Sequence, residues 1–233
     1  MIPARPLVVA HRGVWGEAPQ NSLASLEAAI ELGCDMVELD VRLTGDRRLV
    51  TVHDARVGGL AVRTMSAADL RRRLAPGQAP ELEAMVELAA GRIGLDVELK
   101  EDAGLDRALA ALHRHLDPNE YVVTSFRDSA LAAVHTLSPH TQTGLLIRPG
   151  RRPRQLAERI VAANISFLAP PASLARTGLL AWASARGLAS FVWTVNDRRG
   201  LRALLGDPRV AAVITDRPAA ALSLRAERAS FGL

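Results

Sequence analysis

The sequence predicts an α/β fold, a (β/α)8 TIM barrel with a short excursion after the second strand. Eight apolar, strand-like runs alternate with segments of helical periodicity over 233 residues, which is what a closed parallel barrel requires. The composition is 48% hydrophobic but only 3% aromatic, so we expect an aliphatic core. A doubly wound open sheet usually has a glycine-rich phosphate loop after its first strand, and residues 11–16, HRGVWG, do not form one.

The strands follow one another at intervals that leave room for a helix between them. They are expected at residues 7–10, 36–41, 93–99, 121–125, 143–147, 165–169, 190–194 and 212–215. Between the first two, residues 22–32 are predicted to be helical, because Leu23, Leu26, Ala29 and Ile30 share one face and Ser22 can cap the N-terminus.

The excursion begins after a tight turn at residues 45–48. A short strand at residues 49–53 is expected to extend the barrel top as a hairpin, with His53 leaning over the mouth. Residues 54–80, rich in Gly, Arg and Pro, are predicted to carry one short helix at 66–74. Because they form a lid-like excursion and not a second unit, we expect one domain over residues 1–233.

Composition and charge narrow the function classes. The net charge of +4 and the pI near 10.4 are compatible with a polyanion partner, but the arginines are spread along the predicted helices, which argues against nucleic acid. No window approaches the roughly 20 apolar residues of a membrane span, and the N-terminus lacks a secretory pattern. Cys34 is the one cysteine and excludes an intrachain disulfide. We expect a cytoplasmic protein.

Acidic residues end two of the predicted strands. Alternate residues of a strand point the same way, so Glu38 and Asp40 are predicted to face the barrel mouth together, as are Asp96, Glu98 and Lys100. Carboxylates brought to one point repel unless a cation joins them. An all-oxygen ligand set selects a hard ion, Mg²⁺ or Ca²⁺. The alternative is a buried ion network in which Arg12, Lys100 and Arg42 neutralise these acids.

Two histidines and two cations end neighbouring segments. His11 and His53 suit general acid and base catalysis, because the ordinary histidine pKa lies near neutrality. Arg12 and Lys100 add positive charge of the kind that clamps a phosphoryl group, so the implied ligand is a phosphate ester. Lys100 is the one lysine among 29 basic residues, which indicates a position that needs a compact ammonium. The other four histidines, at 113, 115, 135 and 140, are expected to be surface or packing residues.

These motifs together resemble the glycerophosphodiester phosphodiesterase family over nearly the whole chain. The matching segments are HRG at 11–13, PQNS at 19–22, VELDV at 37–41, VHD at 52–54, VELK at 97–100, TSF at 124–126, WTVN at 193–196 and ITDRP at 214–218. The resemblance implies a TIM barrel enzyme of lipid and glycerol metabolism that hydrolyses small-molecule glycerophosphodiesters to sn-glycerol 3-phosphate and an alcohol.

The resemblance also implies a role for each matching position. A divalent metal would be held by Glu38, Asp40 and Glu98, the acid and base pair would be His11 and His53, and Arg12 and Lys100 would bind the phosphate. Phe126 and Trp193 would wall the alcohol side of the pocket. One position departs from the family pattern: Gln20 stands where the family usually has Glu, which removes a negative charge close to Arg12.

Three other functions remain open at this stage. A lysophospholipase D-type lipid phosphodiesterase would use the same residues on a larger substrate. A non-catalytic phosphate-binding barrel is suggested by Gln20 and the short excursion. A Schiff-base lyase would use Lys100 as its nucleophile, although Glu98 beside it argues against the depressed lysine pKa that such chemistry needs. The oligomeric state cannot be derived from these patterns.

Overall fold

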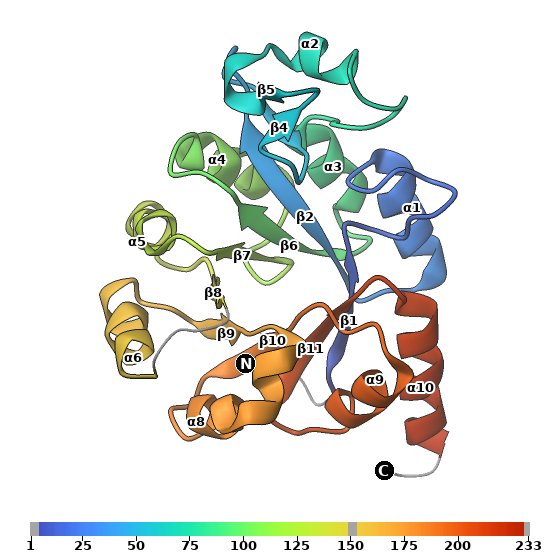
Figure 1. The fold of residues 1–233 in the computed structure, drawn as a ribbon, viewed down its shortest axis with the longest axis vertical. Helices are drawn as coiled ribbons and strands as arrows, with labels where there is room; N and C mark the ends of the chain where they lie inside the picture. Colours follow the sequence, from blue (N-terminus) through green and yellow to red (C-terminus); the bar gives the residue numbers. More distant parts are fainter. Residues whose placement is uncertain (1–4, 149–152, 231–233) are drawn as a thin grey trace.

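The strands form a closed parallel barrel. The computed structural model describes residues 5–148 and 153–230. Its main sheet has the order β1-β11-β10-β9-β8-β7-β6-β2-β3, and the further pairing of β1 with β2 closes the ring (Figure 1). All pairings in the ring are parallel. The predicted TIM barrel is therefore confirmed.

The eight ring strands lie where the apolar runs place them. They are β1 (Leu7–His11), β2 (Met36–Leu43), β6 (Gly94–Leu99), β7 (Tyr121–Ser125), β8 (Thr143–Leu146), β9 (Phe167–Ala169), β10 (Ala189–Val192) and β11 (Val210–Thr215). Strands of a parallel barrel are covered on both faces, so their sequences are nearly continuous apolar runs. Every residue of β11 is buried, as is every residue of β7.

Helices surround the ring (Figure 1). They are α1 (Leu23–Leu32), α3 (Leu82–Ala89), α4 (Leu105–His115), α5 (Asp128–Leu137), α6 (Pro153–Ala162), α7 (Ala172–Leu174), α8 (Leu180–Ser184), α9 (Arg198–Leu204) and α10 (Pro218–Ser230), with a π-helical turn at Ala175–Leu179 between α7 and α8. Ser22 caps α1 as predicted, accepting a hydrogen bond from the Ser25 amide at 3.1 Å. In the described part of the chain, no helix combines the length and the hydropathy that a membrane crossing requires.

The excursion is more structured than the sequence predicts. Strand β3 (Leu49–Thr51) pairs antiparallel with β2, which confirms the expected hairpin. Beyond it lie a small hairpin of β4 (Arg56–Val57) and β5 (Leu60–Ala61), a 3-10 turn at Val62–Thr64 and the short helix α2 (Ala67–Arg71), at the top of the view in Figure 1. The two-residue strands were missed because they are too short for an alternating pattern. They pair around Gly58 and Gly59, both at positive φ.

Candidate active site

Strand register brings the predicted residues together at the carboxyl ends of β1, β2 and β6. His11 is paired with Glu38 across β1 and β2, and Asp40 is paired with Glu98 across β2 and β6. Neighbouring parallel strands lie about 4.8 Å apart, so side chains that point the same way at paired positions are in contact range. A cavity of about 190 Å³ opens there, lined by His11, Arg12, Glu38, His53, Asp96, Glu98, Lys100, Thr124, Phe126, Leu146, Trp193, Thr194 and Ile214.

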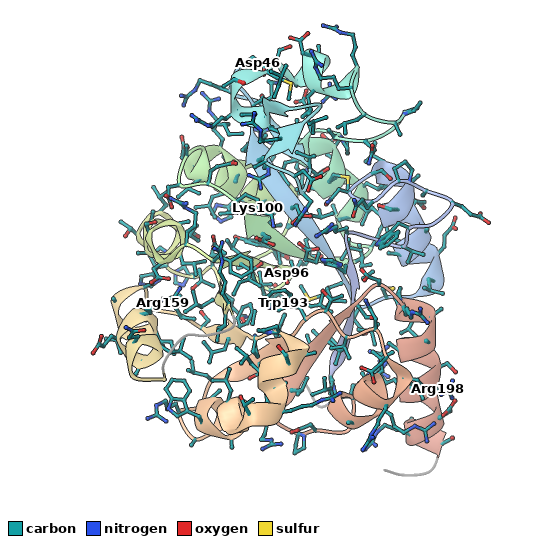
Figure 2. The ribbon with its side chains drawn as sticks, in the orientation of Figure 1. Asp46, Asp96, Lys100, Arg159, Trp193 and Arg198 are labelled. Carbon is teal, nitrogen blue, oxygen red and sulfur yellow. The ribbon has the colours of Figure 1, made fainter. Side chains whose placement is uncertain are left out.

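Three buried carboxylates form what we name the rim cluster: Glu38, Asp40 and Glu98. Each offers an oxygen that lies within 4.8 Å of an oxygen of the others. Two cations contact this cluster. Lys100 Nζ lies 2.7 Å from Asp40 Oδ1 and 2.6 Å from Glu98 Oε1, and Arg12 Nε lies 3.0 Å from Asp40 Oδ2. Lys100 and Asp96 both line the cavity and are labelled over the middle of the view in Figure 2.

The cations do not satisfy the whole cluster. Glu38 Oε1 is buried without a hydrogen-bond partner, and Glu38 Oε2 accepts only the Arg12 backbone amide, at 3.1 Å. The third cation of the alternative ion network, Arg42, lies elsewhere: its Nη1 pairs with Glu101 at 2.6 Å. The network therefore forms around Asp40 and Glu98. Among the described residues it gives Glu38 no arginine or lysine partner, and His11 Nε2 lies 3.9 Å from Glu38 Oε2.

The electrostatics of the rim cluster favour an added cation. Burial raises the pKa of Glu38 well above its ordinary value, and the charges of Asp40 and Glu98 raise it further. Burial also raises the pKa of Glu98, against the opposing charge of Lys100. Burial alone would raise the pKa of Asp40, but Lys100 and Arg12 hold it below its usual range. Three buried oxygen donors, one of them unpartnered, fit a hard divalent cation.

Asp96 is a further buried acid beneath the cluster. Burial raises its pKa to about 7, against the hydrogen bond that the Thr124 hydroxyl donates to its Oδ1 at 2.7 Å. Its other oxygen, Oδ2, has no hydrogen-bond partner. Asp96 was predicted to point inward from β6 with Glu98 and Lys100, and it lines the same cavity.

His11 is fixed by a carboxylate from the far end of the chain. Its Nδ1 lies 2.6 Å from Asp216 Oδ1, and Asn196 Nδ2 donates to Asp216 Oδ2 at 2.6 Å. Asn196 Oδ1 in turn accepts the Asp216 backbone amide at 2.9 Å. A carboxylate at Nδ1 sets the tautomer and the ring orientation, which leaves Nε2 facing the cavity for proton transfer.

His53 reaches the same cavity from the end of the β2–β3 hairpin. Burial lowers its pKa below the ordinary histidine value; Asp40 and the hydrogen bond with Asp54, 2.8 Å from Nδ1, oppose that shift. Arg42 Nε donates to the His53 carbonyl at 2.9 Å and so fixes the backbone at this point. The lowered pKa favours the neutral form of the His53 ring, the form that accepts a proton.

The loop after β1 presents Arg12. Gly13 has φ +83°, and a Cβ there would meet Ser25 Oγ at 2.5 Å, so the loop packs directly onto α1. Gln20, the departure from the family pattern, still holds the arginine, because its Oε1 accepts from Arg12 Nη1 at 2.8 Å. The next residue, Asn21, donates to Asp40 Oδ2 at 2.8 Å and accepts the Asp40 amide at 3.1 Å.

An aromatic wall closes one side of the cavity. Phe126 follows β7 and Trp193 follows β10; their rings meet edge to face, 5.7 Å between centroids and at 86°. Trp193 Nε1 donates to the Ala169 carbonyl at 2.6 Å, which fixes the indole. Trp193 and Asp96, both labelled in Figure 2, line the same cavity. Both residues implied by the resemblance therefore lie in the cavity.

The other four histidines lie outside the cavity lining, as expected. His113 and His115 are on α4, His135 is on α5, and His140 lies in the turn before β8. Sequence reasoning gave no roles to Asp216, Asn196 and Asn21, although all three lie in the quoted motifs. Asp216 directly follows the predicted strand at 212–215, so the rule that places functional residues at strand ends could have found it.

A parallel barrel with carboxylates, cations and a histidine pair at the carboxyl ends of its strands defines a barrel enzyme that acts on phosphate esters. The comparison with family models assigns the particular family: residues 11–220 match the glycerophosphoryl diester phosphodiesterase family. The chain belongs to this family, and its enzyme class is phosphoric diester hydrolase.

The similarity to known proteins covers almost the full chain. A glycerophosphodiester phosphodiesterase of Caldanaerobacter subterraneus subsp. tengcongensis is 27% identical, with 94% of this chain and 98% of that protein covered. Among solved structures, a glycerophosphodiester phosphodiesterase of Parabacteroides distasonis has a TM-score of 0.83 at 26% identity, covering 97% of this chain and 98% of that one. An Oleispira antarctica phosphodiesterase in complex with the product sn-glycerol-3-phosphate has a TM-score of 0.80 at 27% identity, covering 94% and 96%.

Proposed function

We propose that this chain hydrolyses glycerophosphodiesters to sn-glycerol 3-phosphate and an alcohol, with a divalent metal and two histidines. The observation that carries the proposal is the single cavity in which His11 and His53 face the rim cluster, Arg12 and Lys100. The family match and the product named in the Oleispira antarctica complex support the substrate class.

In this proposal Glu38, Asp40 and Glu98 hold the metal, either Mg²⁺ or Ca²⁺. The unpartnered Glu38 Oε1 and the raised pKa of Glu38 support this assignment, because a bound cation would remove the cost of three adjacent buried charges. When bound, the metal would polarise the phosphoryl oxygens as a Lewis acid. With that cation bound, the two glutamates and the aspartate would all be ionised and would hold it in position.

Arg12 and Lys100 bind the phosphodiester. Arg12 is oriented by Gln20 and Asp40, and Lys100 by Asp40 and Glu98, so both positive charges are fixed before substrate enters. Charges that are already oriented stabilise the extra negative charge of the transition state without reorganisation. Phe126 and Trp193 line the side of the cavity where the alcohol lies.

The two histidines transfer the protons. One ring takes the proton of the attacking hydroxyl, and the other donates a proton to the departing alkoxide. The attacking hydroxyl belongs to water, which gives sn-glycerol 3-phosphate directly, or to the glycerol moiety, which gives a cyclic phosphate first. In the second route a water molecule then opens the cyclic phosphate, and the two histidines again take and donate the protons. Asp216 acts on His11 as a positioning residue, because it contacts the imidazole and not the reacting atoms.

The proposal also covers the domain organisation, the kind of substrate and the cellular location. Residues 1–233 act as one domain with a small-molecule substrate. The proposed location is the cytoplasm, as expected from the sequence.

The test is a substrate and metal survey of the purified protein. Turnover of glycerophosphocholine, glycerophosphoethanolamine, glycerophosphoinositol and a lysophospholipid is measured with Mg²⁺ and with Ca²⁺. We expect release of sn-glycerol 3-phosphate from the three water-soluble diesters. Preferred turnover of the lysophospholipid would favour the lysophospholipase D-type alternative. Binding of phosphate esters without any turnover would establish the non-catalytic barrel in its place.

A further inference from the structure

A second cavity adjoins the candidate active site. It has a volume of about 360 Å³ and shares Phe126 and Leu146 with the first cavity. We name it the arginine subsite for its polar lining of Arg127, Asp128, Ser129, Arg148 and Arg159. Because Phe126 and Leu146 wall both cavities, the arginine subsite lies next to the aromatic side of the candidate active site. Figure 2 shows Arg159 on α6, to the left of Trp193.

Two of the three arginines are already neutralised. Arg127 Nε donates to Asp102 Oδ2 at 2.7 Å, and Arg159 Nε donates to Asp128 Oδ2 at 2.6 Å. Arg148, which follows β8, is exposed and pairs with no carboxylate within residues 5–148 and 153–230. The positive charge of Arg148 is therefore the one left for a ligand.

The position of Arg148 also decides which ligands are disfavoured. Its guanidinium carbon lies 4.8 Å from the centroid of the Phe126 ring. An aromatic face is the surface on which a protein binds a quaternary ammonium group. Here a guanidinium already lies on the Phe126 face and would repel a second cation. The second ring of the aromatic wall, that of Trp193, packs edge to face with Phe126, and its Nε1 donates a hydrogen bond to the Ala169 carbonyl.

We propose that the arginine subsite binds an anionic head group, so that the preferred glycerophosphodiester carries a second negative charge on its alcohol. The inference rests on the proposed function and adds the substrate class to it. Arg148 makes the contact to the second anion, and Arg127 and Arg159, locked by their aspartates, shape the cavity.

The test compares two substrates that differ by one phosphate: glycerophosphoinositol 4-phosphate and glycerophosphoinositol. We expect the wild-type protein to turn over the phosphorylated substrate with a kcat/KM about tenfold higher, equivalent to about 1.4 kcal/mol. Arg148→Met keeps much of the side-chain length without the charge, and it should reduce that ratio to about one. Glycerophosphocholine is the third substrate, and its kcat/KM should stay the same or rise in the variant.

Arg186→Met is the matched control. Arg186 also lies over an aromatic ring, 4.2 Å from the Trp182 centroid, but it lines neither cavity. The control should keep the wild-type ratio. A wild-type ratio near one, a ratio that persists in Arg148→Met, or an equal loss on all three substrates would each overturn the subsite. Absence of turnover on every substrate would overturn the proposed function, and the subsite with it.

Discussion

Among the residues that the structure describes, two clusters have metal-like geometry, and they differ in what surrounds them. The rim cluster joins Glu38, Asp40 and Glu98; a second, here named the helix cluster, joins Glu83, Glu87 and His115 of α3 and α4. In both, the candidate ligand atoms lie within 4.8 Å of one another. Every member of the rim cluster is buried, whereas Glu87 is exposed and the other two members of the helix cluster are partly exposed.

The difference appears in the direction of the pKa shifts. Burial raises the pKa of Glu38, but the hydrogen bond from His115 and the pairing with Arg114 lower the pKa of Glu83. The helix cluster is therefore open to solvent, and Arg114 neutralises Glu83. The rim cluster leaves a buried carboxylate oxygen unpartnered. Distances between acids do not by themselves indicate a metal site; burial without compensation does.

The largest expected effect is loss of the metal at the rim cluster. Chelation should abolish turnover, and Glu38→Gln should lower kcat/KM by at least about 1,000-fold, about 4 kcal/mol of transition-state stabilisation. Calorimetric titration with Mg²⁺ and Ca²⁺ should show one site in the wild type and a much weaker one in the variant. Full activity in exhaustively chelated protein would show that the rim cluster, like the helix cluster, holds no metal that turnover requires.

The next effect concerns the histidines beside the rim cluster. His11→Ala and His53→Ala should each lower kcat at least about 100-fold; His113→Ala, away from the cavity, is the control. A substrate with a p-nitrophenolate leaving group needs no proton on departure, so it should rescue the variant that lacks the general acid and not the other. Equal rescue of both variants, or a larger loss in the control, would show that His11 and His53 are not the general acid and general base.

The pH profile sharpens the same comparison. Because burial favours the neutral form of His53, its pKa lies below the ordinary value of about 6.5. The activity that depends on neutral His53 should be fully present above that pH and be lost as the pH falls through the lowered pKa. The acid limb of kcat/KM should therefore lie below pH 6.5 and disappear in the residual activity of His53→Ala. An acid limb above pH 7 would contradict it.

A smaller effect is expected from Lys100→Arg, which keeps the charge of the rim cluster. The guanidinium is wider than an ammonium and cannot contact Asp40 and Glu98 from the same point, so kcat/KM should fall about 30- to 100-fold. The free energy of unfolding and the kinetics are measured together. Turnover close to that of the wild type would show that a point charge is not needed here.

A still smaller loss should follow from Asp216→Asn, about tenfold in kcat with little change in KM, because the ring of His11 loses its charged partner but substrate contacts persist. Asp216→Glu should restore part of the activity. A purely structural role would instead lower the melting temperature of Asp216→Asn and leave the kcat of the folded fraction unchanged.

The double variant Glu83→Gln/Glu87→Gln should have the smallest effect. The helix cluster is solvated, so kcat/KM should change less than about twofold and the stability by about 0.5 kcal/mol or less. The Mg²⁺ titration should match the wild type. A lost binding step in this variant would show that the exposed cluster is the metal site.

The site residues that the sequence predicts are those that stand at the ends of recognisable strands. The apolar runs before Glu38 and Glu98 predict both strands and predict that the acids face the barrel mouth. Closure of the barrel then sets the register between neighbouring strands, which brings the acids together. Asp216 was missed as the partner of His11, and Asn196 as the partner of Asp216, because these side-chain contacts join strand ends that are far apart in the sequence. The β4–β5 hairpin was missed because its two-residue strands are too short to show an alternation of apolar and polar residues. Arg148 was missed because its position over Phe126 depends on side-chain packing.

The contact between His11 and Asp216 also bears on biosynthesis. The two residues are 205 positions apart. At about 5–20 residues per second, a ribosome needs about 10–40 s to travel from one to the other. During that time the nascent chain has the histidine but lacks the group that orients it. His11 thus acquires its orienting carboxylate only after β11 and Asp216 have left the ribosome, so that fragments ending before this strand lack an oriented His11.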